Sequence, residues 1–414
     1  MTSKTKRRAI GLLVLLILFI MCAFSLLAFS GKSIDYVAPL FGAILSCVLI
    51  IEYALMARLF GNFDRFLLIT VDILLCIGMA TQYRMDSAYA FKQLAMFVGG
   101  SILMFICIPF FKKQDIIKKL TLPMMIASII VLGVLLVFGK ENGGAKNWIN
   151  IAGFTFQPSE FVKIATVIVL AFYFDKSSRF KKVFPAFAFV LIIAALLMLE
   201  RDLGAVMLIA GTALIVFYAA TGNILATLGG VAFGAGGALL SYSLFDHVRI
   251  RVAVWQNPWA TYEGSGYQIA QGLMAIASGG LFGVGLGMGT PKIIPAYRTD
   301  YIFAVICEQF GIIVGLCVIA FYIVFIIRGI NIALKAPNRF LMLLGFGCTV
   351  LITLQSFIII GGVIKMIPLT GITLPFVSYG GTSMIACMIL LGILQSIAVQ
   401  GREELTLDEN KTQD

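Results

Sequence analysis

The feature that most constrains the fold is a series of apolar stretches, most of them near the length that crosses a lipid bilayer. A bilayer-spanning helix needs about 20 predominantly apolar residues, and about twelve stretches of roughly 14 to 27 residues occur along the chain. Only 12% of the residues are charged and 60% are hydrophobic, whereas soluble domains contain about 25% charged residues. The sequence therefore predicts an all-α, polytopic membrane protein.

We expect these stretches to form about 12 transmembrane helices. The predicted spans are residues 9–30, 37–57, 66–80, 94–111, 122–138, 161–174, 183–199, 203–220, 224–245, 301–327, 340–364 and 382–399. An even number of spans places both termini on one side of the membrane.

The side of each loop follows from its Lys and Arg residues, because cytoplasmic loops retain these cations during insertion. Cations occur in alternate loops, for example Lys4, Lys6, Arg7, Arg8, Lys112, Lys113, Lys118 and Lys119. Both termini are therefore expected in the cytoplasm, and a large extracytoplasmic loop is expected at 246–300. The net charge of +11 is scattered over short loops, so we expect membrane lipid and no nucleic acid as a partner.

The chain is expected to form one integral membrane domain over residues 1–414. It divides into N-terminal helices at 1–138, a core at 139–400 that holds the motifs described below, and a cytoplasmic tail at 401–414. The single histidine, His247, and eight cysteines that lack a CxxC spacing indicate no metal site.

The first outer segment leads through Trp148 into a helix that begins near Pro158, a residue suited to the first turn. Glu160 and Lys163 follow three residues apart, on one helical face. One interpretation makes Trp148 an interfacial anchor and Glu160–Lys163 a structural ion pair. The other interpretation makes this part of the chain an anion-binding corner.

Ionisable residues inside a span are costly and are functional candidates by default. They are Glu52, Asp72, Lys163, Glu308 and the cluster Glu200-Arg201-Asp202.

The second outer segment, 246–300, combines apolar, basic and aromatic residues, which is typical of a stretch at the membrane interface. Its glycine-rich run at 279–289 lacks the strand and helix that a nucleotide-binding loop needs, so close backbone packing or mobility is expected. Asp300 lies at the end of the segment. It is a candidate for chemistry, and Thr299 or Asp300 is equally a candidate N-cap of the next helix.

The third outer segment, 365–383, contains the run PLTGITLPFVSYGGTS at 368–383, and such irregular backbone at membrane depth must line protein or a cavity. It resembles the signature of the SEDS family, which comprises FtsW, RodA and SpoVE. Three further motifs agree in the same order: KNWI leading to QPSEFVK from 146 to 163, DLG at 202–204, and TDYIFA at 299–304 with Glu308.

The resemblance implies a multi-pass enzyme of the bacterial plasma membrane that polymerises lipid II into glycan strands outside the membrane. Lipid II is a disaccharide-pentapeptide on undecaprenyl diphosphate. The family usually works with a class B penicillin-binding protein. A divalent cation such as Mg²⁺ is compatible with this chemistry, and no other cofactor is expected.

Carried over by motif, Asp300 matches the essential carboxylate and is the predicted catalytic base toward the acceptor hydroxyl. The predicted substrate-binding residues share either a motif position or a cationic side chain near one. They are Lys163, Trp148, Lys146, Arg251, Arg298, Glu160, Glu308, Asp202 and Ser378. The cations among them would hold the diphosphate.

Several positions depart from the family pattern. Ile359 stands where asparagine is expected, and the chain carries two helices more than the usual ten. A flippase for the lipid-linked precursor is the rival function, favoured by twelve helices and by Glu52 and Asp72. The third possible function is that of a non-catalytic scaffold for the penicillin-binding protein.

Overall fold

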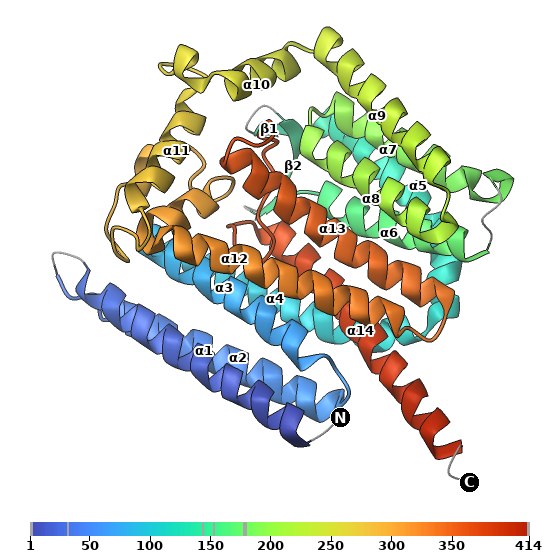
Figure 1. The fold of residues 1–414 in the computed structure, drawn as a ribbon, viewed down its shortest axis with the longest axis horizontal. Coiled ribbons are helices and arrows are strands. Elements are labelled where there is room, and N and C mark those ends of the chain that lie inside the picture. Colours follow the sequence, from blue (N-terminus) through green and yellow to red (C-terminus); the bar gives the residue numbers. More distant parts are fainter. Residues whose placement is uncertain (1–2, 31–32, 143–144, 152–153, 177–179, 412–414) are drawn as a thin grey trace.

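The computed structural model describes residues 3–30, 33–142, 145–151, 154–176 and 180–411, and Figure 1 shows this part as a bundle of helices with one small sheet. Twelve long helices in it coincide with the twelve predicted stretches. They are α1 (Ser3–Phe29), α2 (Val37–Leu59), α3 (Arg65–Met85), α4 (Ser87–Lys112), α5 (Gln114–Phe138), α6 (Ser159–Lys176), α7 (Phe180–Leu199), α8 (Leu203–Thr221), α9 (Ile224–Leu244), α12 (Ile302–Leu334), α13 (Arg339–Val363) and α14 (Gly381–Lys411). The predicted helical, multi-pass architecture is confirmed.

Eleven of the described helices are long and apolar enough to cross a membrane. The exception is α6, which carries Glu160 and Lys163 near its start and Asp175 and Lys176 at its end. This helix packs against α5, α8 and α13, and Glu160 and Lys163 are buried. Its first two charges therefore face protein and not lipid.

Both termini lie at one end of the bundle, and the opposite end carries the short elements of the outer loops (Figure 1). These are α10 (Asp246–Gln256), η1 (Pro258–Thr261), α11 (Tyr267–Gly279) and η2 (Pro291–Ile293). In the predicted tail at 401–414, α14 continues to Lys411; residues 412–414 lie outside the described part.

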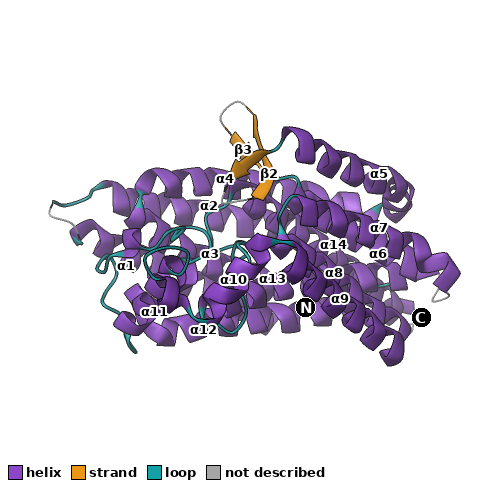
Figure 2. Ribbon diagram, turned by 90° about the horizontal axis from the view of Figure 1, so that it is seen from above, coloured by secondary structure: helices purple, strands orange, loops and turns teal. Residues whose placement is uncertain are grey.

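The outer segment after α5 forms a small antiparallel sheet that the sequence did not predict, and Figure 2 shows it projecting from the helices. Its strands β1 (Lys140–Asn142), β2 (Ala145–Ile151) and β3 (Phe154–Phe156) pair in that order, with Lys140 opposite Trp148 and Ile149 opposite Phe156. Aromatic and β-branched residues favour strands, and β2 contains Trp148, Ile149 and Ile151. The sheet holds Trp148 at the outer end of the bundle.

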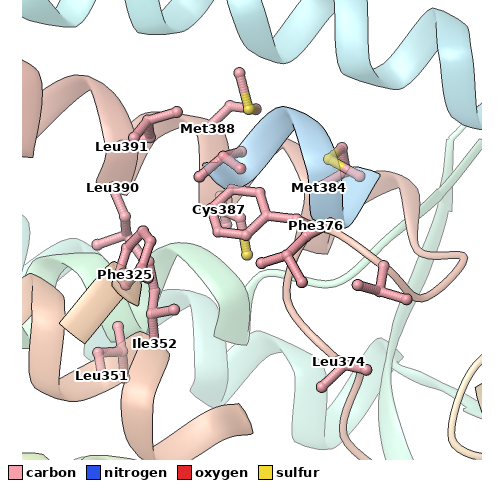
Figure 3. Close-up of a cluster of buried hydrophobic side chains, with 14 of the residues drawn as sticks. Phe325, Leu351, Ile352, Leu374, Phe376, Met384, Cys387, Met388, Leu390 and Leu391 are labelled. Atoms are coloured by element: carbon pink, nitrogen blue, oxygen red, sulfur yellow. The ribbon is translucent and has the colours of Figure 1, made fainter. Parts of the chain in front are cut away.

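The centre of the bundle is formed by α3, α13 and α14, and the periphery by α9. In the most apolar 18-residue window of each helix, 89% of the window is buried in α3 and in α14, but only 6% is buried in α9. Figure 3 shows part of the core, where Phe325, Phe376 and Cys387 gather from α12, α14 and the irregular segment before α14. The rings of Phe325 and Phe376 lie 6.1 Å apart.

This irregular segment, 364–380, is buried at 374–378, and its backbone is bonded by side chains of the helices. The Tyr322 hydroxyl donates to the Pro375 carbonyl at 2.6 Å, and the Gln82 amide donates to the Val377 carbonyl at 2.7 Å. Gln93 donates to the Ser378 carbonyl at 3.1 Å. These bonds agree with the expectation that irregular backbone at this depth lines protein or a cavity, since free carbonyls there would be costly.

The glycine-rich run packs backbone to backbone against a break in α12 at Gly311. The amides of Val284 and Gly285 donate to the carbonyls of Glu308 and Gln309 at 2.9 and 3.1 Å. Gly283 has a φ of +84°, and a Cβ there would lie 2.2 Å from the Gln309 carbonyl oxygen, so a side chain cannot be accommodated. This is the close packing predicted for the run.

Candidate functional site

A cavity of about 950 Å³ lies among the outer ends of the helices. Its walls come from the start of α4, from β2 and β3, from the start of α6, from the corner between α7 and α8, and from α10 and α11. The loop before α12 and the irregular segment before α14 complete it. The motif segments, which are far apart in the sequence, therefore meet around one space.

Asp300 lines this cavity from the turn that precedes α12. The N-cap of α12 is Tyr301, and the cap makes no side-chain hydrogen bond, so capping by Thr299 or Asp300 does not occur. The turn is held from the irregular segment: Ser378 Oγ donates to the Thr299 carbonyl at 2.6 Å, and the Tyr379 amide donates to the Arg298 carbonyl at 2.9 Å. Asp300 is thus presented by a fixed turn.

Arg251 on α10 lines the same cavity and is electrostatically coupled to Asp300. Its Nη1 donates to the carbonyl of Thr370 at 3.0 Å and to that of Leu369 at 3.4 Å. Burial lowers the pKa of Arg251, while Asp202 and Asp300 act to raise it. Burial raises the pKa of Asp300 to about 6, and Thr299 and Arg251 oppose this rise. Asp300 is therefore mostly ionised at neutral pH, and its pKa lies only a little below that pH.

Glu160 and Lys163 form an ion pair of 2.7 Å in the wall of the cavity. Lys163 Nζ also donates to Gln355 Oε1 at 3.2 Å, and the Gln355 amide donates to the Thr373 carbonyl at 2.9 Å. The structural ion pair, one of the two interpretations from the sequence, is therefore present. Because it faces the cavity, it is compatible with the other interpretation as well.

Asp202 fixes the corner between α7 and α8. One carboxylate oxygen accepts from the Ala205 amide at 3.0 Å and caps α8, and the other accepts from the Asn147 amide at 2.7 Å and from the Gln157 amide at 3.4 Å. These bonds join the corner to the sheet, so Asp202 lines the cavity and also supports the position of Trp148, which lines it too.

The cavity lining thus brings together six of the predicted residues: Asp300, Lys163, Trp148, Arg251, Glu160 and Asp202. The other four lie outside the lining. Lys146 is exposed on β2, and Arg298 pairs with Asp86 at 3.1 Å. Glu308 accepts from the Thr290 amide at 3.1 Å. Ser378 is buried, and its hydroxyl bonds Thr299. The last three support the loop that carries Asp300.

Two cavity cations, Lys92 on α4 and Arg201 between α7 and α8, were not among the predicted site residues. A signal for Lys92 was present, because a lysine at the outer end of a span runs against the usual distribution of cations. Arg201 belonged to the charged cluster Glu200-Arg201-Asp202, of which only Asp202 was assigned a role; the φ of +64° at Arg201 could not be read from sequence.

The lining carboxylates of Asp202 and Asp300 are the groups that would hold a divalent cation. Mg²⁺ is usually bound by one or two carboxylates together with the phosphates of a ligand. Among the described residues no group of three or more Asp, Glu, His or Cys side chains surrounds one point. Phosphate oxygens would therefore supply most of the coordination.

Comparisons with known proteins agree with this geometry. The mycobacterial RodA of Mycobacterium tuberculosis, a peptidoglycan glycosyltransferase, is 38% identical over 290 residues, which cover 66% of this chain and 62% of that protein. The stage V sporulation protein E of Bacillus subtilis is 33% identical over 82% of this chain and 98% of its own length. The chain spans about 62% of the length of the first of these relatives.

Solved structures share the fold. RodA of Thermus thermophilus superposes with a TM-score of 0.62 at 24% identity, covering 81% of this chain and 96% of that one. A chain from a structure of a peptidoglycan synthase complex superposes with a TM-score of 0.70 at 24% identity, covering 82% of this chain and 98% of that one. The family model for cell cycle proteins of the FtsW, RodA and SpoVE type matches residues 54–403. The chain therefore belongs to the FtsW/RodA/SpoVE family, as its motifs indicated.

Proposed function

We propose that the chain is a peptidoglycan glycosyltransferase that polymerises lipid II on the outer face of the bacterial plasma membrane. The observation that carries the proposal is the joint position of Asp300 and Arg251 in a cavity at the outer end of the bundle. The names of the curated relatives support it, since RodA proteins and a Geobacter FtsW are described as known or probable peptidoglycan glycosyltransferases.

In the reaction, the 4-hydroxyl of the acceptor sugar attacks the anomeric carbon of the donor, and the undecaprenyl diphosphate leaves. Asp300 takes the hydroxyl proton as the new bond forms. A diphosphate leaves without protonation, so one carboxylate suffices, unlike the pair required for glycoside hydrolysis. General-base catalysis of this kind contributes about 10²- to 10⁴-fold. A carboxyl pKa of about 6 keeps the base ionised at neutral pH and still basic enough to accept the proton.

The diphosphate needs cations, and Arg251 is the first candidate. Part of its guanidinium is held by backbone carbonyls, and such anchored donors stabilise developing charge without reorganisation. Lys92 and Arg201 face the same cavity and add positive charge. Lys163 shares its charge with Glu160, so we assign it to the wall of the site. Lys146 and Arg298 are less suited, because they lie outside the lining.

The flippase alternative is less well supported. Transport through the bilayer needs polar groups along the membrane depth, whereas the cavity gathers its charges at the outer end. Glu52 and Asp72 are buried in α2 and α3 and are not part of the lining. The scaffold alternative does not account for a cavity that holds a carboxylate and several cations.

A class B penicillin-binding protein is the proposed partner, because one structural neighbour belongs to a complex described as coordinating polymerization and crosslinking. We retain the division into helices 1–138, core 139–400 and tail 401–414 as part of the proposal. The family match begins at residue 54, so α1 and most of α2 are the additional helices.

A detergent assay separates the enzyme from the flippase. The purified protein, alone and with a class B partner, is incubated with lipid II in micelles, and glycan chains are resolved on a gel. A polymerase forms chains in micelles, whereas a flippase has no second membrane face to act on. Chains from the wild-type protein support the proposal, and their absence in the presence of the partner contradicts it.

A further inference from the structure

The turn between α10 and α11 carries an aromatic surface beside the cavity. Trp259 and Tyr262 are 54% and 37% exposed, and their rings are nearly parallel, with an angle of 20° between the planes and 6.3 Å between the centres. Figure 1 shows this connection at the outer end of the bundle, away from both termini. We call these two residues the aromatic platform.

The platform is held in place by hydrogen bonds and ring packing. The Gln271 side-chain amide on α11 donates to the Tyr262 hydroxyl at 2.9 Å, and the Tyr262 ring packs on that of Tyr267 with the centres 5.6 Å apart. The turn itself is closed by the Gly266 amide, which donates to the Thr261 carbonyl at 2.9 Å. Tyr262 is therefore oriented before any ligand arrives, which lowers the cost of binding.

The platform is continuous with the cavity wall. Before it in the chain, Arg251 and Val254 on α10 line the cavity, and after it Ser265 and Gln268 do so. The platform thus lies between two stretches of the wall, and it ends only three residues before Ser265. A molecule that leaves the cavity along this wall meets the two rings.

The residues around the platform suit a sugar better than a lipid. Residues 256–266 read QNPWATYEGSG and contain no lysine, arginine or large aliphatic residue, but one carboxylate, Glu263. A stretch in the membrane interface combines cations with large apolar residues, as α10 does with Arg249 and Ile250. An aromatic face flanked by hydroxyl, amide and carboxylate groups instead matches a sugar ring, which has an apolar C–H face and a hydroxyl edge.

We infer that the aromatic platform is a product-side subsite that binds the growing glycan strand where it leaves the cavity. The inference rests on the proposed polymerase function and extends it from a single transfer to repeated transfers. A strand that stays bound between additions becomes long, whereas a strand that dissociates after a few additions stays short. The platform therefore acts on the length of the strands more than on the rate of each transfer.

Strand length and rate are measured in one reaction, with the purified full-length protein, its class B partner and lipid II in micelles. Gel separation gives the mean strand length, and consumption of lipid II gives the initial rate. Trp259→Ala should shorten the strands by about 2- to 10-fold, the effect of one lost aromatic contact, without a matching fall in the initial rate. Phe282→Ala is the matched control, because it removes an 81% exposed ring from the glycine-rich run. It should leave both quantities at their wild-type values.

Two further variants separate glycan binding from other contacts of an exposed ring. Trp259→Leu keeps apolar bulk without a flat face, so it should shorten the strands as alanine does, whereas Trp259→Phe should restore most of the wild-type length. If Trp259→Leu gives wild-type strands, the ring is an apolar anchor in the membrane interface and the inference is overturned. It is also overturned if Trp259→Ala loses the partner on size-exclusion chromatography, because the surface then binds the partner.

The outcomes distinguish the subsite from the enzyme itself. Strands of equal length from the wild type, Trp259→Ala and Phe282→Ala overturn the glycan subsite and leave the polymerase in place. If the wild type forms no strands in the presence of the partner, the polymerase is contradicted and the subsite falls with it.

Discussion

Arg298 donates to Asp86 at 3.1 Å, and its guanidinium lies 3.9 Å from the ring centre of Tyr89. Asp86 also caps α4 by accepting from the Ala88 amide. The turn that carries Asp300 is therefore held against the corner between α3 and α4. We assign Arg298 a positioning role in place of the predicted contact with diphosphate.

Arg298→Ala should lower kcat by about 10- to 100-fold, the effect of a misplaced catalytic group, with little change in KM for lipid II. Asp86→Asn should give the same pattern, because it removes the other half of the pair. Initial rates of polymerisation against lipid II concentration measure both. A large rise in KM with kcat preserved would instead indicate a substrate contact.

Arg251→Gln should raise the KM for lipid II by about 10- to 100-fold, since a charged hydrogen bond to a diphosphate contributes roughly 1.5–3 kcal/mol. Arg251→Lys should recover part of this loss, because it restores the charge without the guanidinium fork. Substrate binding to the two variants, measured with a fluorescent lipid II, provides the check. Equal affinity of both variants and the wild type would remove Arg251 from the diphosphate site.

The polymerisation rate should depend on pH through Asp300. The base acts only when ionised, and burial raises its pKa from 3.8 to about 6, so kcat/KM should rise as the pH increases through about 6 and level off above it. Asp300→Glu should move this rise of kcat/KM to a different pH. In Asp300→Asn, the residual rate should no longer rise with pH in this range. If the rate of Asp300→Asn still rises near pH 6 as in the wild type, another group must be the one that titrates there.

The Glu160–Lys163 pair allows stability to be separated from activity. Lys163→Met leaves the Glu160 carboxylate buried without its cation, a change that costs about 3–5 kcal/mol. The double variant Glu160→Gln with Lys163→Met should regain most of the thermal stability, because no charge is then stranded. Thermal unfolding in detergent measures this, and the glycan gel reports activity. Equal melting temperatures for the single and double variants would contradict the account.

The sequence was sufficient to predict the helices, because each apolar stretch must satisfy its own backbone within the bilayer. The shortest predicted span, 161–174, is also a helix, and the structure extends it to Ser159–Lys176. The small sheet was missed, since strands of three to seven residues carry a weak signal. The sheet is also bonded to a corner distant in sequence, because the Asn147 side chain donates to Asp202.

The site could be predicted in part. The motifs indicated Asp300, Asp202 and the Glu160–Lys163 pair, and all four line the cavity. The partner of Arg298 could not be read from sequence, because Asp86 lies 212 residues away in a corner with no motif. The choice between Asp300 as a helix cap and Asp300 as a cavity residue also needed the structure, since the helix begins at Ile302 with Tyr301 as its cap.

The most direct test of the central claim is the rate of lipid II polymerisation by purified Asp300→Asn, which keeps the size of the side chain and removes its basicity. Asp246→Asn is the matched control, since this exposed outer carboxylate belongs to α10 and pairs with Arg249. With the class B partner present and equal melting temperatures, we expect Asp300→Asn to lose at least about 100-fold in rate and Asp246→Asn to match the wild type. Polymerisation by Asp300→Asn at the wild-type rate would contradict the account.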